Sequence, residues 1–195
     1  PLEGGDKNML FEKDFGPEKK LDLEAKVNGL SWMEKKHYRD DDLIDLGLPE
    51  NAAVYLHRTL SCKEAVSLYV SLGSNDAIKC WLNGELLLEN HVNRSVAAGQ
   101  ETAALHLKKG VNSFLMKIVN GTNASGFYFN ILPSLVPRDV RQVIQRETQE
   151  WSQAEFKIVE SYVQSLRSEG ADSEFLASTD SWFHPINLTH GPDGA

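Results

Sequence analysis

The feature that most constrains this chain is a dense series of short apolar runs between residues 52 and 132, separated by glycine, asparagine, aspartate and lysine. In one of these runs every second residue is apolar: Val66, Leu68, Val70 and Leu72. A period of two is typical of a strand with one buried face, whereas a helix repeats every three or four residues. Several such strands in succession predict a mainly β fold, a jelly-roll β-sandwich over residues 19–132.

Two dipeptides mark chain reversals inside this region. Asn83 and Gly84 lie between two apolar runs, and both residues tolerate the positive φ that a type I′ hairpin turn requires. One strand earlier, Asn75 and Asp76 can form a tight turn because their side chains bond nearby backbone groups. We therefore expect a three-strand meander with these two turns.

The sequence before residue 52 has a different pattern. Residues 1–18 are polar and glycine-rich, and they predict an N-terminal arm laid on the edge of the domain. The next segment alternates apolar residues with charges, which predicts a half-buried strand: Leu21, Leu23, Ala25 and Val27. Residues 28–51 are irregular and charged, with one short strand expected around Trp32.

After the predicted sandwich the period changes. Apolar residues recur three and four apart through residues 133–170, which predicts an extension of two helices. Ser152 and Glu155 fit a capping box at the start of the second helix, and Gly170 fits its end. Residues 171–195 have no period and predict an irregular tail, extended or mobile.

Composition narrows the possible partners. The net charge is -8 with a pI near 5.2, so nucleic acid is not an expected partner. The chain has no apolar run of about 18 residues, and no membrane span is expected. The start at Pro1 has neither an initiator methionine nor a signal-peptide pattern, so we expect a fragment of a longer protein. Cys62 and Cys80 are expected as buried strand thiols, with a single disulfide as the alternative.

A series of positions in the middle of the chain matches a known class of domain. The positions are Ser74, Asn75, Asp76, Trp81, Leu82, Asn83, Gly84, Lys108, Gly110, Asn112, Leu115, Lys117 and Asn120. This series resembles the galactose-binding-like β-sandwich, a class similar to carbohydrate-binding modules. The helical segment is similar to the linker that follows such sandwiches in modular secreted planctomycete proteins, beside cytochrome-c-like domains.

The resemblance implies an accessory, non-catalytic domain of an exported protein, secreted or periplasmic, that contacts a glycan and neighbouring domains. Five residues are the candidates for glycan binding: Trp32, Asn75, Asp76, Trp81 and Asn120. Trp81 is out of phase with the apolar residues of its strand, so its ring should point away from the main core, where it can stack on a sugar. The alternative is that Trp81 packs beneath the helices or the N-terminal arm.

Other chemistry has weaker support in the sequence. Residues 37–42 bring three carboxylates together, which could hold Ca²⁺, although a solvated charged run is the alternative. The six histidines show no zinc-hydrolase spacing, and the chain has no Gly-x-Ser-x-Gly motif. We therefore expect no metal, no cofactor and no catalytic residue. Two alternatives stay open: a structural or assembly domain without a small ligand, and a hydrolase whose two acids lie far apart in the sequence.

Overall fold

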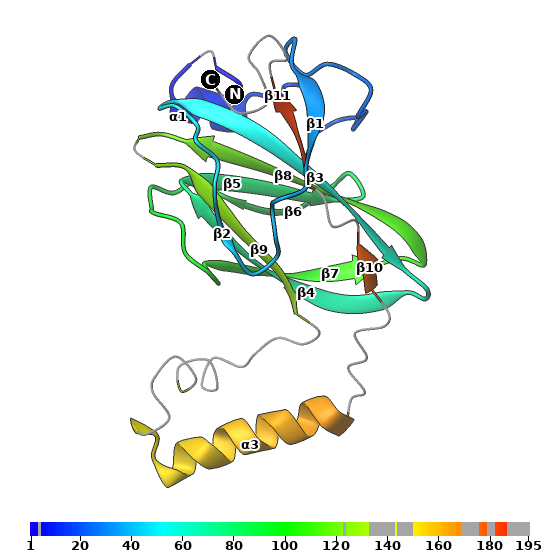
Figure 1. Cartoon of the computed structure of the whole chain (residues 1–195), viewed down its shortest axis with the longest axis vertical. Helices are drawn as coiled ribbons and strands as arrows, with labels where there is room; N and C mark the ends of the chain where they lie inside the picture. The colour runs from blue at the N-terminus through cyan, green and yellow to red at the C-terminus, as the bar shows by residue number, and fades with distance from the viewer. Residues whose placement is uncertain are drawn as a thin grey trace.

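Two antiparallel β-sheets pack face to face and enclose the main hydrophobic core (Figure 1). The computed structural model describes residues 1–3, 5–122, 124–132, 143, 150–168, 176–178 and 182–186. One sheet has the order β2 (Leu43–Asp45), β9 (Gly126–Leu132), β4 (Val66–Asn75) and β7 (Glu101–Leu107). The other is built on β3 (Ala52–Cys62), β8 (Gly110–Asn120), β5 (Ala77–Leu82) and β6 (Glu85–Asn90). Short strands extend this second sheet beyond β3: β1 (Ser31–Lys35), β10 (Leu176–Ser178) and β11 (Trp182–Ile186).

The connections give this sandwich the topology of a jelly roll. From β2 to β5 each strand is followed by one in the opposite sheet, and the same holds from β6 to β9, whereas β5 and β6 form a hairpin within one sheet. The predicted jelly-roll β-sandwich is therefore confirmed. The predicted meander is wrong, because Asn75 and Asp76, joined by a cis peptide bond, carry the chain from β4 in one sheet to β5 in the other.

The Asn83–Gly84 turn between β5 and β6 is confirmed. Both residues have positive φ, 53° and 84°, as a type I′ turn requires. The Asn83 side chain also ties the turn to the neighbouring strand: its Oδ1 accepts from the backbone N–H of Ser113 at 3.0 Å, and its Nδ2 donates to Oδ1 of Asn112 at 3.0 Å. The side chain thus fixes the hairpin to β8 as well as shaping the turn.

The main core is made of the inward-facing alternate residues of both sheets. On β4, Val70 and Leu72 are fully buried and Val66 packs against them, so the alternation predicted for this strand is confirmed. Cys62 and Cys80 are free and buried, as expected, and they form no disulfide. Burial raises the pKa of the Cys80 thiol, which keeps the thiol protonated and unreactive.

A second hydrophobic cluster lies on the outer face of the β3, β8 and β5 strands, beneath the N-terminal arm. Helix α1 (Lys7–Glu12) crosses this face, and its Leu10 and Phe11 are buried there. At the start of the arm, Leu2 forms a β-bridge with Ala53 of β3. The arm that was expected at the domain edge therefore covers the outer face of a sheet, and Figure 1 shows α1 and β1 above the sandwich.

The half-buried strand predicted for residues 21–27 is wrong, because this segment is irregular, with bends at residues 23–25 and only an isolated bridge at Val27. The irregular backbone has a local cause, because the carboxylate of Asp22 accepts from the backbone N–H of Glu24 at 3.0 Å and of Ala25 at 3.3 Å. Such an Asx turn competes with extended structure. Val27 is buried at the end of the segment, and the strand expected around Trp32 follows as β1.

The C-terminal part confirms one expected helix and differs in the tail. Helix α3 (Gln153–Ser168) begins with the predicted capping box, in which Ser152 N donates to Oε2 of Glu155 at 2.8 Å and Glu155 N donates to Oγ of Ser152 at 3.3 Å. The first predicted helix and Gly170 lie almost wholly outside the described residues. Where an irregular tail was expected, the short strands β10 and β11 pair with β3 and β1. No helix among the described residues is long and apolar enough to cross a membrane.

Candidate functional site

Three of the five predicted glycan-binding residues meet where β4 crosses to β5, at one end of the sandwich. The Asp76 carboxylate accepts two backbone N–H groups, that of Arg94 at 2.8 Å on Oδ1 and that of Gly121 at 3.0 Å on Oδ2. Asn120, next to Gly121, is fully buried and donates from Nδ2 to the carbonyl of Pro49 at 2.9 Å. Both side chains hold separate loops against the sandwich, which is a structural role.

Arg94 closes this crossover cluster from the side. Its Nη1 lies 2.7 Å from Oε1 of Glu101, and its Nη2 donates to Oγ of Ser74 at 2.9 Å. Asn75 is 7% exposed, and its Oδ1 is buried without a hydrogen-bond partner among the described residues. The cluster is thus packed and internally bonded, with one free acceptor.

The loop between β6 and β7 lies over the outer face of β4 near this cluster. A Cβ atom at Gly73 would stand 1.9 Å from the carbonyl oxygen of Ala97, so only glycine lets the loop approach so closely. Oε1 of Gln100 accepts from the backbone N–H of Ser74 at 2.9 Å and fixes the loop in place. The loop therefore lies against β4 at Gly73 and Ser74, directly before Asn75.

The two candidate tryptophans lie elsewhere. Trp81 points away from the main core, as predicted, and it is 7% exposed because it packs in the second cluster beneath the N-terminal arm. Trp32 lies on strand β1, where a short strand was expected, and it packs half-buried against the same cluster. The five predicted residues therefore do not share one open surface, and their glycan-binding role stays a prediction.

The acidic run at residues 37–42 serves to anchor its loop. Asp40 pairs with the buried guanidinium of Arg58. Asp41 accepts from the Tyr128 hydroxyl at 2.5 Å and from Nδ2 of Asn130 at 3.2 Å. The two carboxylates thus face different partners, and the described residues contain no group of three side chains suited to a metal ion.

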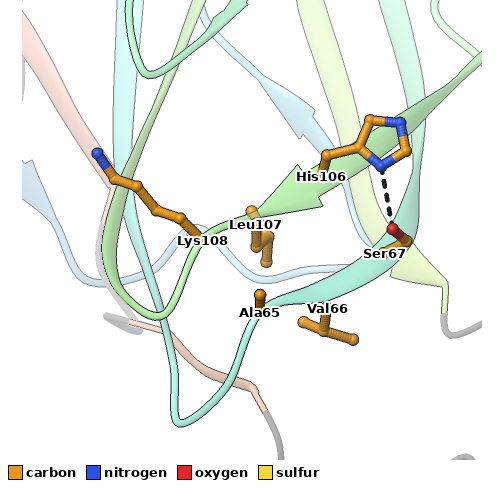
Figure 2. A pocket seen from close by; sticks show the side chains of 6 residues that line it. All are labelled: Ala65, Val66, Ser67, His106, Leu107 and Lys108. Atoms are coloured by element: carbon orange, nitrogen blue, oxygen red, sulfur yellow. Dashed lines mark hydrogen bonds between the residues drawn. The ribbon is translucent and has the colours of Figure 1, made fainter.

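An open pocket of about 360 Å³ lies at the other end of β4, where β4 begins beside the end of β7. The pocket is lined by Ala65, Val66, Ser67, His106, Leu107 and Lys108. Figure 2 shows the Lys108 side chain leading away from the Ser67–His106 pair, with Leu107 between the two strands and Val66 below β4 in this view. In this pair Ser67 Oγ lies 3.0 Å from Nδ1 of His106, and both side chains are exposed. Val66 and Leu107 are paired and face the core, so the pocket lies at the strand ends, where core-facing and outward-facing side chains both line it.

The outer face of β4 and β7 continues the pocket. Ser67 pairs with His106 in register, and the next outward pair along the strands is Tyr69 with Ala104. Paired residues of an antiparallel sheet point to the same side, so the half-buried Tyr69 ring lies next to the Ser67–His106 pair. We name Ser67, Tyr69 and His106 the β4–β7 strip.

Sequence reasoning missed this strip because its residues appear as the polar side of two ordinary strands. Ser67 and His106 are 39 residues apart, and only the β4–β7 pairing brings them together. The one available signal was Tyr69, a large aromatic ring on the face that otherwise carries serines.

Comparison with known families gives a partial match. Residues 122–195 match the model of a family described as a domain of unknown function, DUF7133. The matched part begins just before β9 and includes α3, β10 and β11, whereas the pocket and most of the sandwich lie before it. No curated protein matches the chain.

Several solved structures share part of the fold. The chain is similar to the PA14 domain of the MpAFP antifreeze protein, with 15% identity over 42% of this chain and 43% of that one, at a TM-score of 0.36. It is also similar to the β-glucosidase of Kluyveromyces marxianus in complex with glucose, with 19% identity over 58% of this chain and 17% of that one, at a TM-score of 0.37. The EclA C-terminal domain, a sugar-binding protein, gives 12% identity, 67% and 99% coverage, and a TM-score of 0.21.

These likenesses are limited in extent. The chain spans less than half the length of the PA14 structure and a small part of the β-glucosidase. At such identities and scores the similarity concerns the β-sandwich architecture alone, and the ligand has to be argued from the residues of this chain.

Proposed function

We propose that this chain is a non-catalytic accessory module of an exported protein, and that it binds carbohydrate on the β4–β7 strip. The observation that carries the proposal is the open pocket at the start of β4 and the end of β7, which the exposed Ser67–His106 pair lines together with Ala65 and Val66. Ligand sites combine an apolar lining with a few polar groups that orient the ligand. The pocket and its neighbour Tyr69 supply both.

The chemistry of the strip suits a sugar ring. A pyranose has an apolar face of C–H groups and a rim of hydroxyls, so it stacks on an aromatic ring and exchanges hydrogen bonds at its edge. Tyr69 offers the ring, while Ser67 and His106 each offer a group that donates or accepts. The resemblance of the sequence to galactose-binding-like modules supports the same class of ligand.

Retention on immobilised polysaccharides tests the proposal. Wild-type protein should be slowed on at least one polysaccharide gel, and His106→Ala or Tyr69→Ala should weaken the binding by about tenfold, because each removes a hydrogen bond or a stacking surface. Val111→Ala is the matched control, since Val111 lies on β8 of the other sheet and is 65% exposed.

The same gels separate the strip from the crossover cluster. Loss of retention in Asn75→Ala, with His106→Ala and Tyr69→Ala unchanged, would place the sugar at the crossover and overturn the assignment to the strip. A wild-type chain that no gel in a broad panel retains would overturn carbohydrate binding itself.

A second candidate function is an assembly domain that contacts neighbouring domains. The observation in its favour is α3, which lies apart from both sheets in Figure 1 and exposes 48% of Phe156, beside the ring of Trp151 at 5.2 Å. Contiguous apolar patches mark contact surfaces, and we propose that Phe156 and Trp151 belong to such a patch. Phe156→Ser should leave sugar retention unchanged and abolish co-purification with the adjoining domains if this function holds.

A further inference from the structure

The face beneath the N-terminal arm carries a row of polar residues that runs across four strands. Tyr55 on β3, Lys117 on β8, Lys79 on β5 and Glu89 on β6 are register neighbours in turn. Lys117 is fully buried and Lys79 is 9% exposed. We name these residues the lysine row. Two buried ammonium groups side by side need partners, because an unpaired buried charge is very costly.

The arm supplies those partners from one segment of eight residues, Phe11–Glu18, with the sequence FEKDFGPE. Nζ of Lys117 donates to the carbonyl of Phe11 at 3.2 Å, to the carbonyl of Lys13 at 2.7 Å and to Oε1 of Glu18 at 2.7 Å. These three bonds satisfy all three donors of the ammonium. Lys117 therefore recognises the backbone of the segment as well as its acid.

Tyr55 completes the recognition of the segment's second half. Its hydroxyl donates to Oε1 of Glu18 at 2.6 Å, so two members of the row, Tyr55 and Lys117, hold the carboxylate. The ring of Phe15 meets the Tyr55 ring edge-on, with centroids 6.5 Å apart, and it lies 5.6 Å from Nζ of Lys117. Tyr55 and Lys117 thus both contact the acid and the aromatic ring of this half of the segment.

Lys79 recognises the first half. Its Nζ lies 4.2 Å above the Phe11 ring and 3.9 Å from Oε2 of Glu12. The other side of the Phe11 ring is stacked on His91 at 4.5 Å. Both ends of the segment therefore combine a phenylalanine with an acidic side chain against a lysine.

Two properties make this contact separable from the sandwich. The bonded residues of the segment and Lys117 are 99–106 residues apart, so the fit depends on recognition between side chains and backbone, not on a local turn. When the segment leaves, the two lysines regain hydration, while the apolar side chains of the second cluster around them become exposed. An uncovered face therefore favours binding of an equivalent segment, and the arm of a second copy has the same sequence and the same contacts to offer.

We infer that the lysine row is a peptide-recognition site for an acidic segment with two phenylalanines, supplied in cis by the chain's own arm and in trans by the same segment of a second copy. The partner in trans is thus another molecule of this protein, bound by exchange of the arm.

A nicked form of the full chain tests the inference. A protease site is inserted between Asn28 and Gly29, two exposed turn residues with positive φ, and the purified protein is then cleaved. A fluorescent peptide of residues 1–28 is added, and its binding is followed by anisotropy. We expect the peptide to replace the cleaved arm of the nicked protein. Its affinity for the intact protein should be about a hundredfold lower than for the nicked protein, because the tethered arm competes at high effective concentration.

Matched peptides define the chemistry of the site. A peptide with Glu18→Gln should bind the nicked protein about tenfold more weakly, since it loses a charge-assisted bond to Lys117. A peptide with Lys20→Gln should bind as the wild type does, because Lys20 is exposed. Equal binding of the Glu18→Gln peptide would overturn the inference.

Two further outcomes bear on it directly. A nicked protein that loses its β circular dichroism, or that never exchanges its arm, would show that the arm is an inseparable part of the fold and would overturn the inference. In native mass spectra the intact chain should show a dimer fraction that rises with concentration and falls in the Glu18→Gln chain. A chain that stays monomeric throughout would overturn the contact between copies.

Discussion

The two outer faces of this sandwich are used in opposite ways. The outer face of β3, β8 and β5 is covered by the N-terminal arm, which buries Trp81, Tyr55 and Lys117. The outer face of β4 and β7 leaves Ser67 and His106 exposed beside a pocket. The first face combines apolar burial with a bonded charge. The second carries solvent-exposed hydrogen-bonding groups that contact each other and water.

The difference shows where stability and binding reside in such a fold. Side chains that are packed and bonded internally contribute to stability, and they have little capacity left for a ligand. The residues most suggestive of a ligand by type, the tryptophans and the crossover amides, belong to the packed part of the molecule. The residues free to bind are ordinary serine, tyrosine and histidine side chains on an open strand pair.

Of the changes considered, removal of the Trp81 side chain should lower the stability of the covered face most. Trp81→Ala leaves a cavity under the arm, and we expect a loss of about 3–5 kcal/mol in the free energy of unfolding, measured by urea denaturation. Val111→Ala, at a position 65% exposed on β8, should change it by less than about 0.5 kcal/mol. A cost for Trp81→Ala as small as that of the control would mean that the arm does not bury this face in solution.

Acid should weaken the covered face through His57. In the strand register His57 of β3 and Trp81 of β5 are the two neighbours of Leu115 on the central strand β8. Burial lowers the pKa of His57 from 6.5 to about 4. The unfolded chain therefore binds a proton between pH 6.5 and 4 that the folded chain does not, so stability is full above pH 6.5 and falls by about 3 kcal/mol as the pH drops to 4.

Denaturation curves at pH 7 and pH 4 measure this loss in wild type and in His57→Gln. The wild type should lose about 3 kcal/mol more than the variant over that interval, because the amide of the substituted side chain cannot take up the proton. The same pH dependence in both proteins would assign the acid sensitivity to other groups.

Glu18→Gln should loosen the covered face locally. The change removes the negative charge bonded to Lys117 and Tyr55, and we expect it to weaken arm docking by about 1.4 kcal/mol, which is the tenfold effect expected for the peptide. Hydrogen exchange of the amides of α1 would accelerate, while those of β4 and β9 would keep their protection. Lys20→Gln, at an exposed position, is the control, and uniform acceleration over all strands would contradict a local effect.

The open face should respond least in stability. Ser67→Ala and His106→Ala remove exposed groups, so each should change the free energy of unfolding by less than about 0.5 kcal/mol. Sugar retention should nevertheless fall in both. A loss of stability above about 1 kcal/mol would indicate that the Ser67–His106 pair is a packing feature rather than a free rim.

The sequence predicts those features of the fold that depend on local chemistry. Alternation on β4 identifies its buried face, Asn83–Gly84 identifies a hairpin, and Ser152 with Glu155 identifies a helix start. Each of these depends on residues within one turn or one strand of each other. Such signals are visible without knowledge of the fold.

Pairing between distant segments was not visible in this way. Turn chemistry at Asn75–Asp76 indicates that the chain bends, but not which sheet the next strand joins. Alternation at residues 21–27 predicts a strand, yet the Asp22 side chain forms an Asx turn there instead. The pocket and the lysine row are built by strand pairs whose members lie far apart in the chain, so neither forms a motif.

The manner in which Lys117 holds the arm has a practical consequence. Nζ of Lys117 donates to the main-chain carbonyl of Lys13, while the Lys13 side chain is exposed to solvent. That position can therefore change its side chain without losing its anchor. A dye attached through Lys13→Cys would report by its fluorescence whether the N-terminal arm is bound to the sheet or released.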